Sequence, residues 1–202
     1  MSDHALAKDL AACTLCASRF ATTASAHRPR PVVWFRPTAR VLIASQAPGM
    51  RAHKAARPFT DPSGVRLRAW LGVNEDTFYD KNLFAIVPMG FCFPGYDAKG
   101  SDLPPPRICA QTWRAPILAG LSKIALTLLI GGYAQKWHLG PEARAGVTET
   151  VRRWRDYAPD VFPLPHPSWR NTAWLNRNPW FEAECLPALR ARLGEVLKQV
   201  ET

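Results

Sequence analysis

Four of the five cysteines are spaced as ligands of a metal centre. Cys13 and Cys16 form a Cys-x-x-Cys pair, and Cys92 and Cys109 stand seventeen positions apart around a proline-rich stretch. Four thiolates are the ligand set of a [4Fe–4S] cluster and also of a Cys₄ zinc site. A redox-active pair would normally follow a strand, whereas the segment around Cys13 is typical of a helix. The fifth cysteine, Cys185, falls within a helical pattern and is expected in the core.

Three loops carry further side chains that could do chemistry. They cover residues 44–64, 88–95 and 164–171, and each follows a short apolar run that is typical of a buried strand. In sheets of parallel strands, ligands bind at the loops that leave the carboxyl ends of the strands. We therefore expect the active-site groups in these three loops.

The elements that must position these loops alternate between strand and helix. The buried strands are expected at Arg40–Ser45, Leu83–Met89, Ile124–Ile130 and Val161–Leu164. Helical periodicity covers Gly64–Leu71, Arg107–Leu118, Val147–Tyr157 and Pro179–Val200, the last with Asn178 as its N-cap. This order predicts an α/β protein of three layers, α/β/α, with a central, mainly parallel, four-stranded sheet.

Composition restricts the class of protein and of partner. A chain of 202 residues with 47% hydrophobic residues favours one well-buried domain and excludes a disordered chain. No apolar run approaches the roughly 20 residues of a membrane span, and the N-terminus lacks a signal-peptide pattern, so we expect a cytoplasmic monomer. Lysine and arginine number 26 against 16 acidic residues, for a net charge of +10. This excess favours a phosphate-bearing partner, although a solvated basic face would look the same.

Taken together, the three loops resemble the motifs of the uracil-DNA glycosylase superfamily. The segment Gln46-Ala47-Pro48-Gly49 is similar to the water-positioning motif, which reads Gly-Glu-Ala-Pro-Gly in family 4. Residues 57–64 resemble the Pro-Phe segment whose aromatic ring stacks on the extruded base, and the Asp after Phe-Thr also leans toward family 5. The third segment, His166-Pro167-Ser168, looks like the loop that follows the extruded nucleotide into the minor groove. The resemblance spans Cys13 to about Phe181.

The resemblance implies a role for each loop in excising a flipped-out base from DNA. Phe59 is implied to stack on the base, and His166 to donate to uracil O2 as a neutral imidazole. Asp61 is the acid placed to orient a water or to stabilise the sugar cation, and Gln46 takes the position of the family 4 acid. Further substrate and DNA contacts are implied for Ala47, Pro48, Gly49, Ser63, Met89, Gly90, Pro167, Ser168, Arg170 and Asn171.

The resemblance also extends to the cofactor and to the DNA-binding surface. It favours a [4Fe–4S] cluster on Cys13, Cys16, Cys92 and Cys109, with zinc as the alternative. Trp169 and Trp174 are candidates to wedge into the base stack, whereas Trp180 is expected to pack. A phosphate track could involve Arg28, Arg30, Arg36, Arg51, Lys54 and Arg57.

Three departures from the family pattern leave two main functions open. Gln46 and Ala47 occupy positions that carry an acidic residue in related families, and Pro88 stands where the family has the asparagine that reads uracil. Proline has neither an amide side chain nor an N–H, so the backbone of Met89 or Gly90 would have to substitute. One function is a DNA glycosylase of base-excision repair for uracil or another deaminated base. The other is a weakly active or inactive DNA-binding protein of the same fold, and a zinc-binding structural protein is a more remote third.

Overall fold

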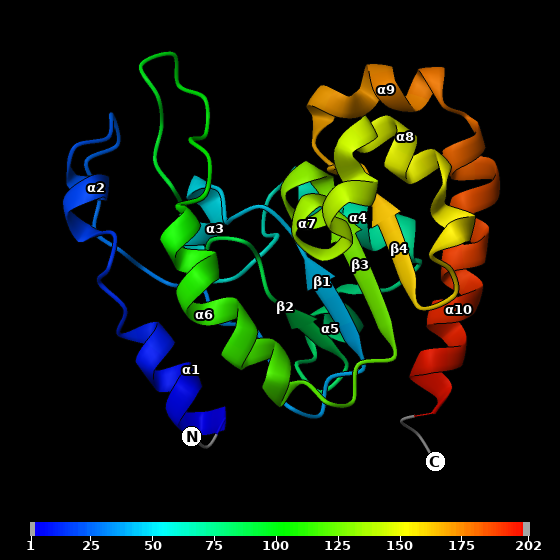
Figure 1. Ribbon diagram of the computed structural model, residues 1–202, viewed down its shortest axis with the longest axis horizontal. Helices are drawn as coiled ribbons and strands as arrows, with labels where there is room; N and C mark the ends of the chain where they lie inside the picture. The colour runs from blue at the N-terminus through cyan, green and yellow to red at the C-terminus, as the bar shows by residue number, and fades with distance from the viewer. Residues whose placement is uncertain (1–2, 200–202) are drawn as a thin grey trace.

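The structure is a computed structural model, and the residues that it describes are 3–199 (Figure 1). Its centre is a sheet of four parallel strands in the order β2-β1-β3-β4. The strands are β1 (Val41–Ala44), β2 (Phe84–Ile86), β3 (Leu126–Ile130) and β4 (Val161–Leu164). The four predicted strands and their parallel arrangement are confirmed, with β1, β2 and β3 shorter than expected. Helices surround this sheet, so the predicted α/β class is confirmed.

Helices precede the first strand, connect the strands and follow the last strand. The α-helices are α1 (Asp3–Ala11), α2 (Ala17–Ala21), α3 (Met50–Ala55), α4 (Pro62–Leu71), α5 (Glu75–Tyr79), α6 (Arg107–Gly120), α7 (Gly131–Leu139), α8 (Val147–Arg152), α9 (Thr172–Arg177) and α10 (Leu186–Lys198). Short 3₁₀ turns are η1 (Gly140–Ala145), η2 (Trp154–Asp156) and η3 (Trp169–Asn171), and η4 (Phe181–Cys185) is a π-helical turn that leads into α10.

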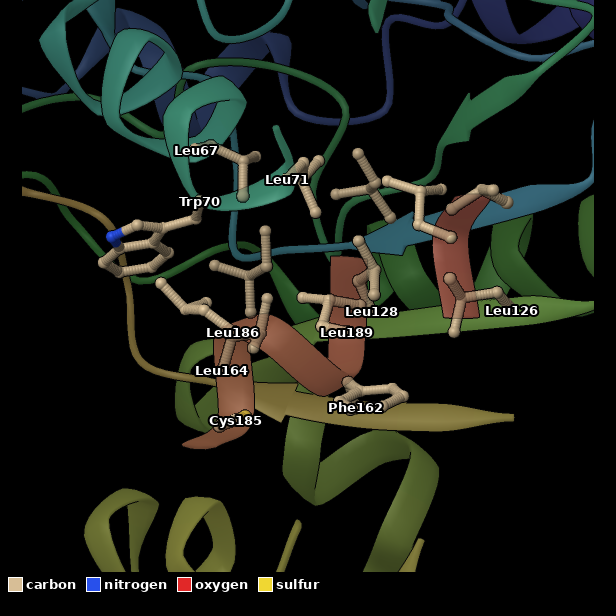
Figure 2. Close-up of a cluster of buried hydrophobic side chains, with 14 of the residues drawn as sticks. Leu67, Trp70, Leu71, Leu126, Leu128, Phe162, Leu164, Cys185, Leu186 and Leu189 are labelled. Carbon is tan, nitrogen blue, oxygen red and sulfur yellow. The ribbon is translucent and has the colours of Figure 1, made fainter. Parts of the chain in front are cut away.

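Alternate residues of each strand face opposite sides of the sheet and build two cores. On one face, residues such as Ile43 and Leu128 pack against α4 and α10, together with Phe162 and Cys185. Figure 2 shows this cluster, in which Leu67 and Leu71 of α4 meet Leu186 and Leu189 of α10 above the strands. The expectation that Cys185 belongs to the core is confirmed, since its side chain is fully buried.

On the other face, α1 and α6 cover the sheet. Leu42 of β1 and Ala85 of β2 pack with Leu10 of α1 and with Cys109 and Ile117 of α6. Cys109 therefore reaches this core from the first turn of α6, the helix predicted from Arg107. The helix that covers the sheet thus also fixes one of the candidate metal ligands.

Several predicted boundaries differ from the structure. The helix expected over Pro179–Val200 begins with the π-helical turn and continues as α10, and Val200 lies outside the described residues. Asn178 is not its N-cap, because its side-chain oxygen accepts from the Trp180 indole rather than from a backbone N–H. The predicted helix over Val147–Tyr157 divides into α8 and a 3₁₀ turn.

No helix among the described residues is long and apolar enough to cross a membrane.

Candidate active site

The three predicted loops meet in one cavity of about 630 Å³ at the carboxyl ends of β1, β2 and β4. This is where a parallel sheet presents its loops for binding. The predicted site residues that line the cavity are Gln46, Ala47, Pro48, Gly49, Phe59, Asp61, Ser63, His166, Ser168, Arg170 and Asn171. Met89, Gly90 and Pro167 are not among the lining residues, although Pro88 is.

Phe59 is held in a backbone conformation that its surroundings impose. Its φ of +53° lies in the left-handed region, which is uncommon for a residue with a side chain. The Tyr79 hydroxyl donates toward two carbonyl oxygens, that of Pro58 at 2.8 Å and that of Phe59 at 2.9 Å. A Cβ atom at Gly64 would stand 1.8 Å from the Phe59 carbonyl oxygen, so only glycine allows this approach. The half-buried Phe59 ring packs edge-on against Phe78 and is fixed at the cavity wall.

Asp61 has a structural contact as well as a place in the cavity. It is the N-cap of α4, and its Oδ1 accepts from the Gly64 amide at 3.2 Å. Pro62 follows at the first helical position, which favours the start of a helix here. The carboxylate also lies close enough to His166 to favour the charged imidazole. The Asp61 carboxylate therefore lines the cavity while one of its oxygens caps α4.

The contacts of His166 define its protonation state. The Ser168 amide donates to His166 Nδ1 at 3.2 Å, so Nδ1 is an acceptor and the neutral ring carries its proton on Nε2. Burial lowers the pKa of His166, against a smaller opposing effect of Asp61. A ring that is neutral and protonated on Nε2 can donate a hydrogen bond from that atom, which is the form that the resemblance implied.

Two neighbours hold the loop that carries His166. Asn171 Nδ2 donates to the His166 carbonyl oxygen at 2.7 Å, and Arg66 Nη1 donates to the Ser168 carbonyl oxygen at 2.9 Å. The Asn171 amide therefore has a contact within the protein, beyond the DNA contact expected for it. Beyond this loop, Trp169 and Arg170 are exposed, and the Trp169 residue is 74% accessible.

The end of β2 offers no free donor for the edge of a base. The Met89 amide donates to the Ser45 carbonyl and the Gly90 amide to the Gln46 carbonyl, at 2.8 Å and 3.0 Å. Both amides therefore tie the segment after β2 to the loop after β1 and are not free donors, while substitution for the missing asparagine by other backbone groups of Met89 or Gly90 stays a prediction. The Pro88 carbonyl also has a partner, since Arg114 Nη1 donates to it at 3.1 Å.

Arg114 is fully buried, and neither its burial nor its contacts were predicted from the sequence. Its guanidinium donates to the Val87 carbonyl and, through Nη2, to His138 Nε2 at 2.6 Å. Burial lowers the pKa of His138 to about 4, so this histidine is neutral and accepts. Arg114 thereby connects α6 and α7 to the segment that follows β2. Its position within an apolar helical pattern gave no sign of this role.

The structure reduces the set of candidate DNA contacts. Arg57 forms an ion pair with Glu75 at 2.8 Å, and its guanidinium stacks on Tyr79 at 3.5 Å from the ring centroid. These contacts within the protein account for Arg57 without a DNA contact. The prediction that Trp174 wedges into the base stack is wrong. The Trp174 indole donates to Thr148 Oγ1, and its ring packs against Trp180 and Phe181. The same contacts confirm Trp180 as a packing residue.

The four candidate ligands line one apolar cavity between α1, α2 and α6. Cys13 and Cys16 lie in the turn between α1 and α2 rather than within a helix, whereas Cys92 comes from the segment after β2 and Cys109 from α6. Leu10, Phe20 and Trp113 complete its lining. None of the four is in a disulfide. Four cysteines that are far apart in the sequence therefore line the same cavity, and their role as metal ligands stays a prediction.

The environment of these thiols is dry and carries donors to sulfur. The Phe91 amide donates to Cys109 Sγ at 3.4 Å. Burial raises the pKa of Cys92 to about 12 and that of Cys109 to about 11, with the other thiols of the group adding to the shift. Among the described residues, no three His, Cys, Asp or Glu side chains converge closely enough to hold one metal ion.

The sequence missed the contribution of a hairpin. Residues 95–103 form a loop closed by a bridge between Tyr96 and Asp102, and it rises beside α2 in Figure 1. Tyr96, Gly100 and Asp102 line the cavity. Glycine and charged residues at 97–102 are typical of a surface turn, so only the three-dimensional structure places Asp102 at the site.

The chain also matches the model of a known protein family. The family model of the uracil DNA glycosylase superfamily matches residues 32–190. The match covers all four strands, the three loops and two of the four cysteines, and it begins after the Cys-x-x-Cys pair. The chain therefore belongs to the uracil DNA glycosylase superfamily.

Proposed function

We propose that this protein is a DNA glycosylase of base-excision repair that hydrolyses the N-glycosidic bond of uracil or another deaminated base. The observation that carries the proposal is the single cavity that joins Phe59, Asp61 and His166 at the carboxyl ends of the strands. An aromatic face, a carboxylate and a neutral donor are what excision of a flipped base requires.

Each group has a role that its contacts support. The Phe59 ring, fixed by Tyr79 and Gly64, would stack on the extruded base. His166 Nε2–H would donate to the base as negative charge develops on it, and a buried neutral imidazole suits this electrostatic role. Asp61 would either orient the attacking water or stabilise positive charge on the sugar. Exposed Arg170 would contact phosphate beside the cavity.

A second candidate function is favoured by the end of β2. Pro88 has no donor, and the Met89 and Gly90 amides are already bonded to carbonyls of the loop after β1. Gln46 replaces the acid of family 4. These features favour a DNA-binding protein that is weakly active or inactive.

Cleavage of defined oligonucleotides distinguishes the two functions. Duplex and single-stranded substrates carrying one uracil, hypoxanthine or xanthine are incubated with the protein and then treated with alkali to break abasic sites. A glycosylase gives a strand break at the lesion after alkali, and the matched undamaged oligonucleotide stays intact. Lesion-selective binding without breaks supports the second function.

We also propose that Cys13, Cys16, Cys92 and Cys109 hold a [4Fe–4S] cluster. The four thiols line one apolar cavity but do not converge on a point. Each iron of a four-iron cube takes one thiolate, so a cube suits ligands spread around a cavity better than one zinc ion at about 2.3 Å from all four sulfurs. The cluster would supply a structural cross-link between the N-terminal turn, the segment after β2 and α6.

A further inference from the structure

Two acidic side chains line the candidate active-site cavity, Asp61 and Asp102. They come from different elements, Asp61 from the start of α4 and Asp102 from the hairpin at 95–103. The Asp61 carboxylate lies close enough to raise the pKa of Asp102, in addition to the larger effect of burial. The cavity therefore holds one more acid than the sequence motifs indicate.

The two carboxylates differ in what engages them. Asp61 caps α4 through its bond with the Gly64 amide. Within residues 3–199, the structure gives the Asp102 carboxylate neither a hydrogen bond nor an ion pair at contact distance. Of the two, Asp102 is the one whose oxygens are both available to a small molecule in the cavity.

Asp102 also lies against the loop that has lost its acid. Its Oδ2 is 4.0 Å from the position that a Cβ atom would take at Gly49. Gly49 ends the segment Gln46-Ala47-Pro48-Gly49, in which family 4 carries its glutamate. The hairpin thus brings a carboxylate from outside the motif to the motif that positions the water.

The hairpin is anchored well enough to place a side chain. Its first residue, Gly95, has φ +100°, and a Cβ there would meet Thr23 at 2.7 Å. The Leu103 amide donates to the Gly95 carbonyl at 2.8 Å and closes the base of the hairpin. At the tip, Asp97 Oδ1 accepts from the amides of Lys99 and Ser101, both at 2.8 Å.

We propose that Asp102 is a further catalytic residue, the carboxylate that orients and deprotonates the attacking water; this inference rests on the proposed glycosylase function. The water oxygen bonds to the sugar C1′ while the C1′–N bond breaks and its electron pair leaves with the base. The water proton passes to the Asp102 carboxylate. The anionic base accepts a hydrogen bond from His166 Nε2–H. This assignment leaves Asp61 to stabilise the positive charge of the sugar.

The surroundings of Asp102 give the reaction a distinctive pH dependence. Burial raises the pKa of Asp102, Arg170 acts against this, and Asp61 adds to it. His166 lines the same cavity in its neutral form. Because the base must be deprotonated, the rate should rise with pH through a pKa above the ordinary aspartate value of about 3.9.

Single-turnover cleavage compares the wild type with Asp102→Asn, Asp102→Glu and Asp97→Asn. Asp97→Asn is the matched control, since it removes one charge from the same hairpin while an amide oxygen keeps both tip hydrogen bonds. We expect Asp102→Asn to slow cleavage about 10²-fold or more, to leave lesion binding unchanged and to lose the acid limb of the pH profile. Asp102→Glu should keep the acid limb, and Asp97→Asn should behave as the wild type.

The outcomes separate this inference from the proposed function. Equal rates for the wild type and Asp102→Asn overturn the role of Asp102 while the glycosylase function stands. Equal losses in Asp102→Glu and Asp102→Asn, with melting temperatures as in the wild type, also overturn it, because the carboxylate would then not matter. A wild type that releases none of the tested bases removes the proposed function and this inference with it.

Discussion

The Ser168 amide fixes the proton of His166 on Nε2, so one backbone contact decides what the imidazole can do. We predict that His166→Ala slows base release by about 10²–10³, as removal of a donor to a developing oxyanion does. His166→Gln, which keeps an N–H donor, should retain more of the rate. Single-turnover kinetics at saturating protein measures both. A rate for His166→Ala equal to that of the wild type would exclude His166 from the reaction.

Asp61 combines capping with a place at the site, and two substitutions separate these roles. Asn is as good an N-cap as Asp, whereas Ala typically loses about 1 kcal/mol. We therefore predict that Asp61→Asn keeps the free energy of unfolding and that Asp61→Ala lowers it by about 1 kcal/mol, as measured by urea denaturation. Asp61→Asn should still slow cleavage, because the charge near the sugar is lost. If Asp61→Asn cleaves at the wild-type rate, the residue is a cap alone.

At the scale of elements, the start of α4 is what holds Phe59 at the cavity. We predict that Gly64→Ala lowers the free energy of unfolding by about 1–3 kcal/mol or more, because the added methyl group collides with the Phe59 carbonyl. Gly194→Ala is the matched control, since a Cβ there meets nothing within 4 Å. In the interior of α10, this change should stabilise by about 0.5–1 kcal/mol. Similar urea midpoints for the two variants would contradict the close approach of α4 to Phe59.

A second prediction at the scale of elements concerns the cavity that Cys13, Cys16, Cys92 and Cys109 line. Cys92→Ser should lose bound iron and the visible absorption that bleaches on reduction, whereas Cys185→Ser should keep both, because Cys185 is enclosed in the other core. Iron content per chain and the absorption spectrum are the measurements. A colourless wild type with one zinc per chain would refute the cluster.

The strands and main helices could be predicted from the sequence because their patterns are local. Continuous apolar runs such as Val161–Leu164 have one plausible environment, a buried parallel strand. The positions of Asp102 and Arg114 could not be predicted, since they depend on packing between elements distant in the chain. Asp102 lies in a polar turn, and Arg114 in a helix whose face becomes defined only against β2. Likewise, the use of the Met89 and Gly90 amides follows from the pairing of β2 with β1.

On the scale of the whole molecule, the charge of +10 would make the proposed binding to DNA sensitive to salt. We predict that the logarithm of the affinity falls linearly with the logarithm of salt concentration, with a slope of about −0.9 for each phosphate neutralised. Arg170→Ala should reduce the magnitude of this slope by about 0.9, the contribution of one phosphate contact, and equally for damaged and undamaged DNA. Lys123→Ala, at the opposite end of the sheet before β3, is the control and should leave the slope unchanged. A loss confined to one lesion would mean that Arg170 reads the base instead.

The central claim is that this cavity releases a base from DNA, and detection of the free base tests it most directly. The protein is mixed in excess with duplexes that carry one uracil, hypoxanthine or xanthine, and the products are separated by chromatography. We predict free base from at least one lesion, in equal amount to alkali-labile sites at that position, and about 10²–10³ slower release with His166→Ala. Retention of every base by the wild type, together with tight binding to the same duplexes, would contradict the claim.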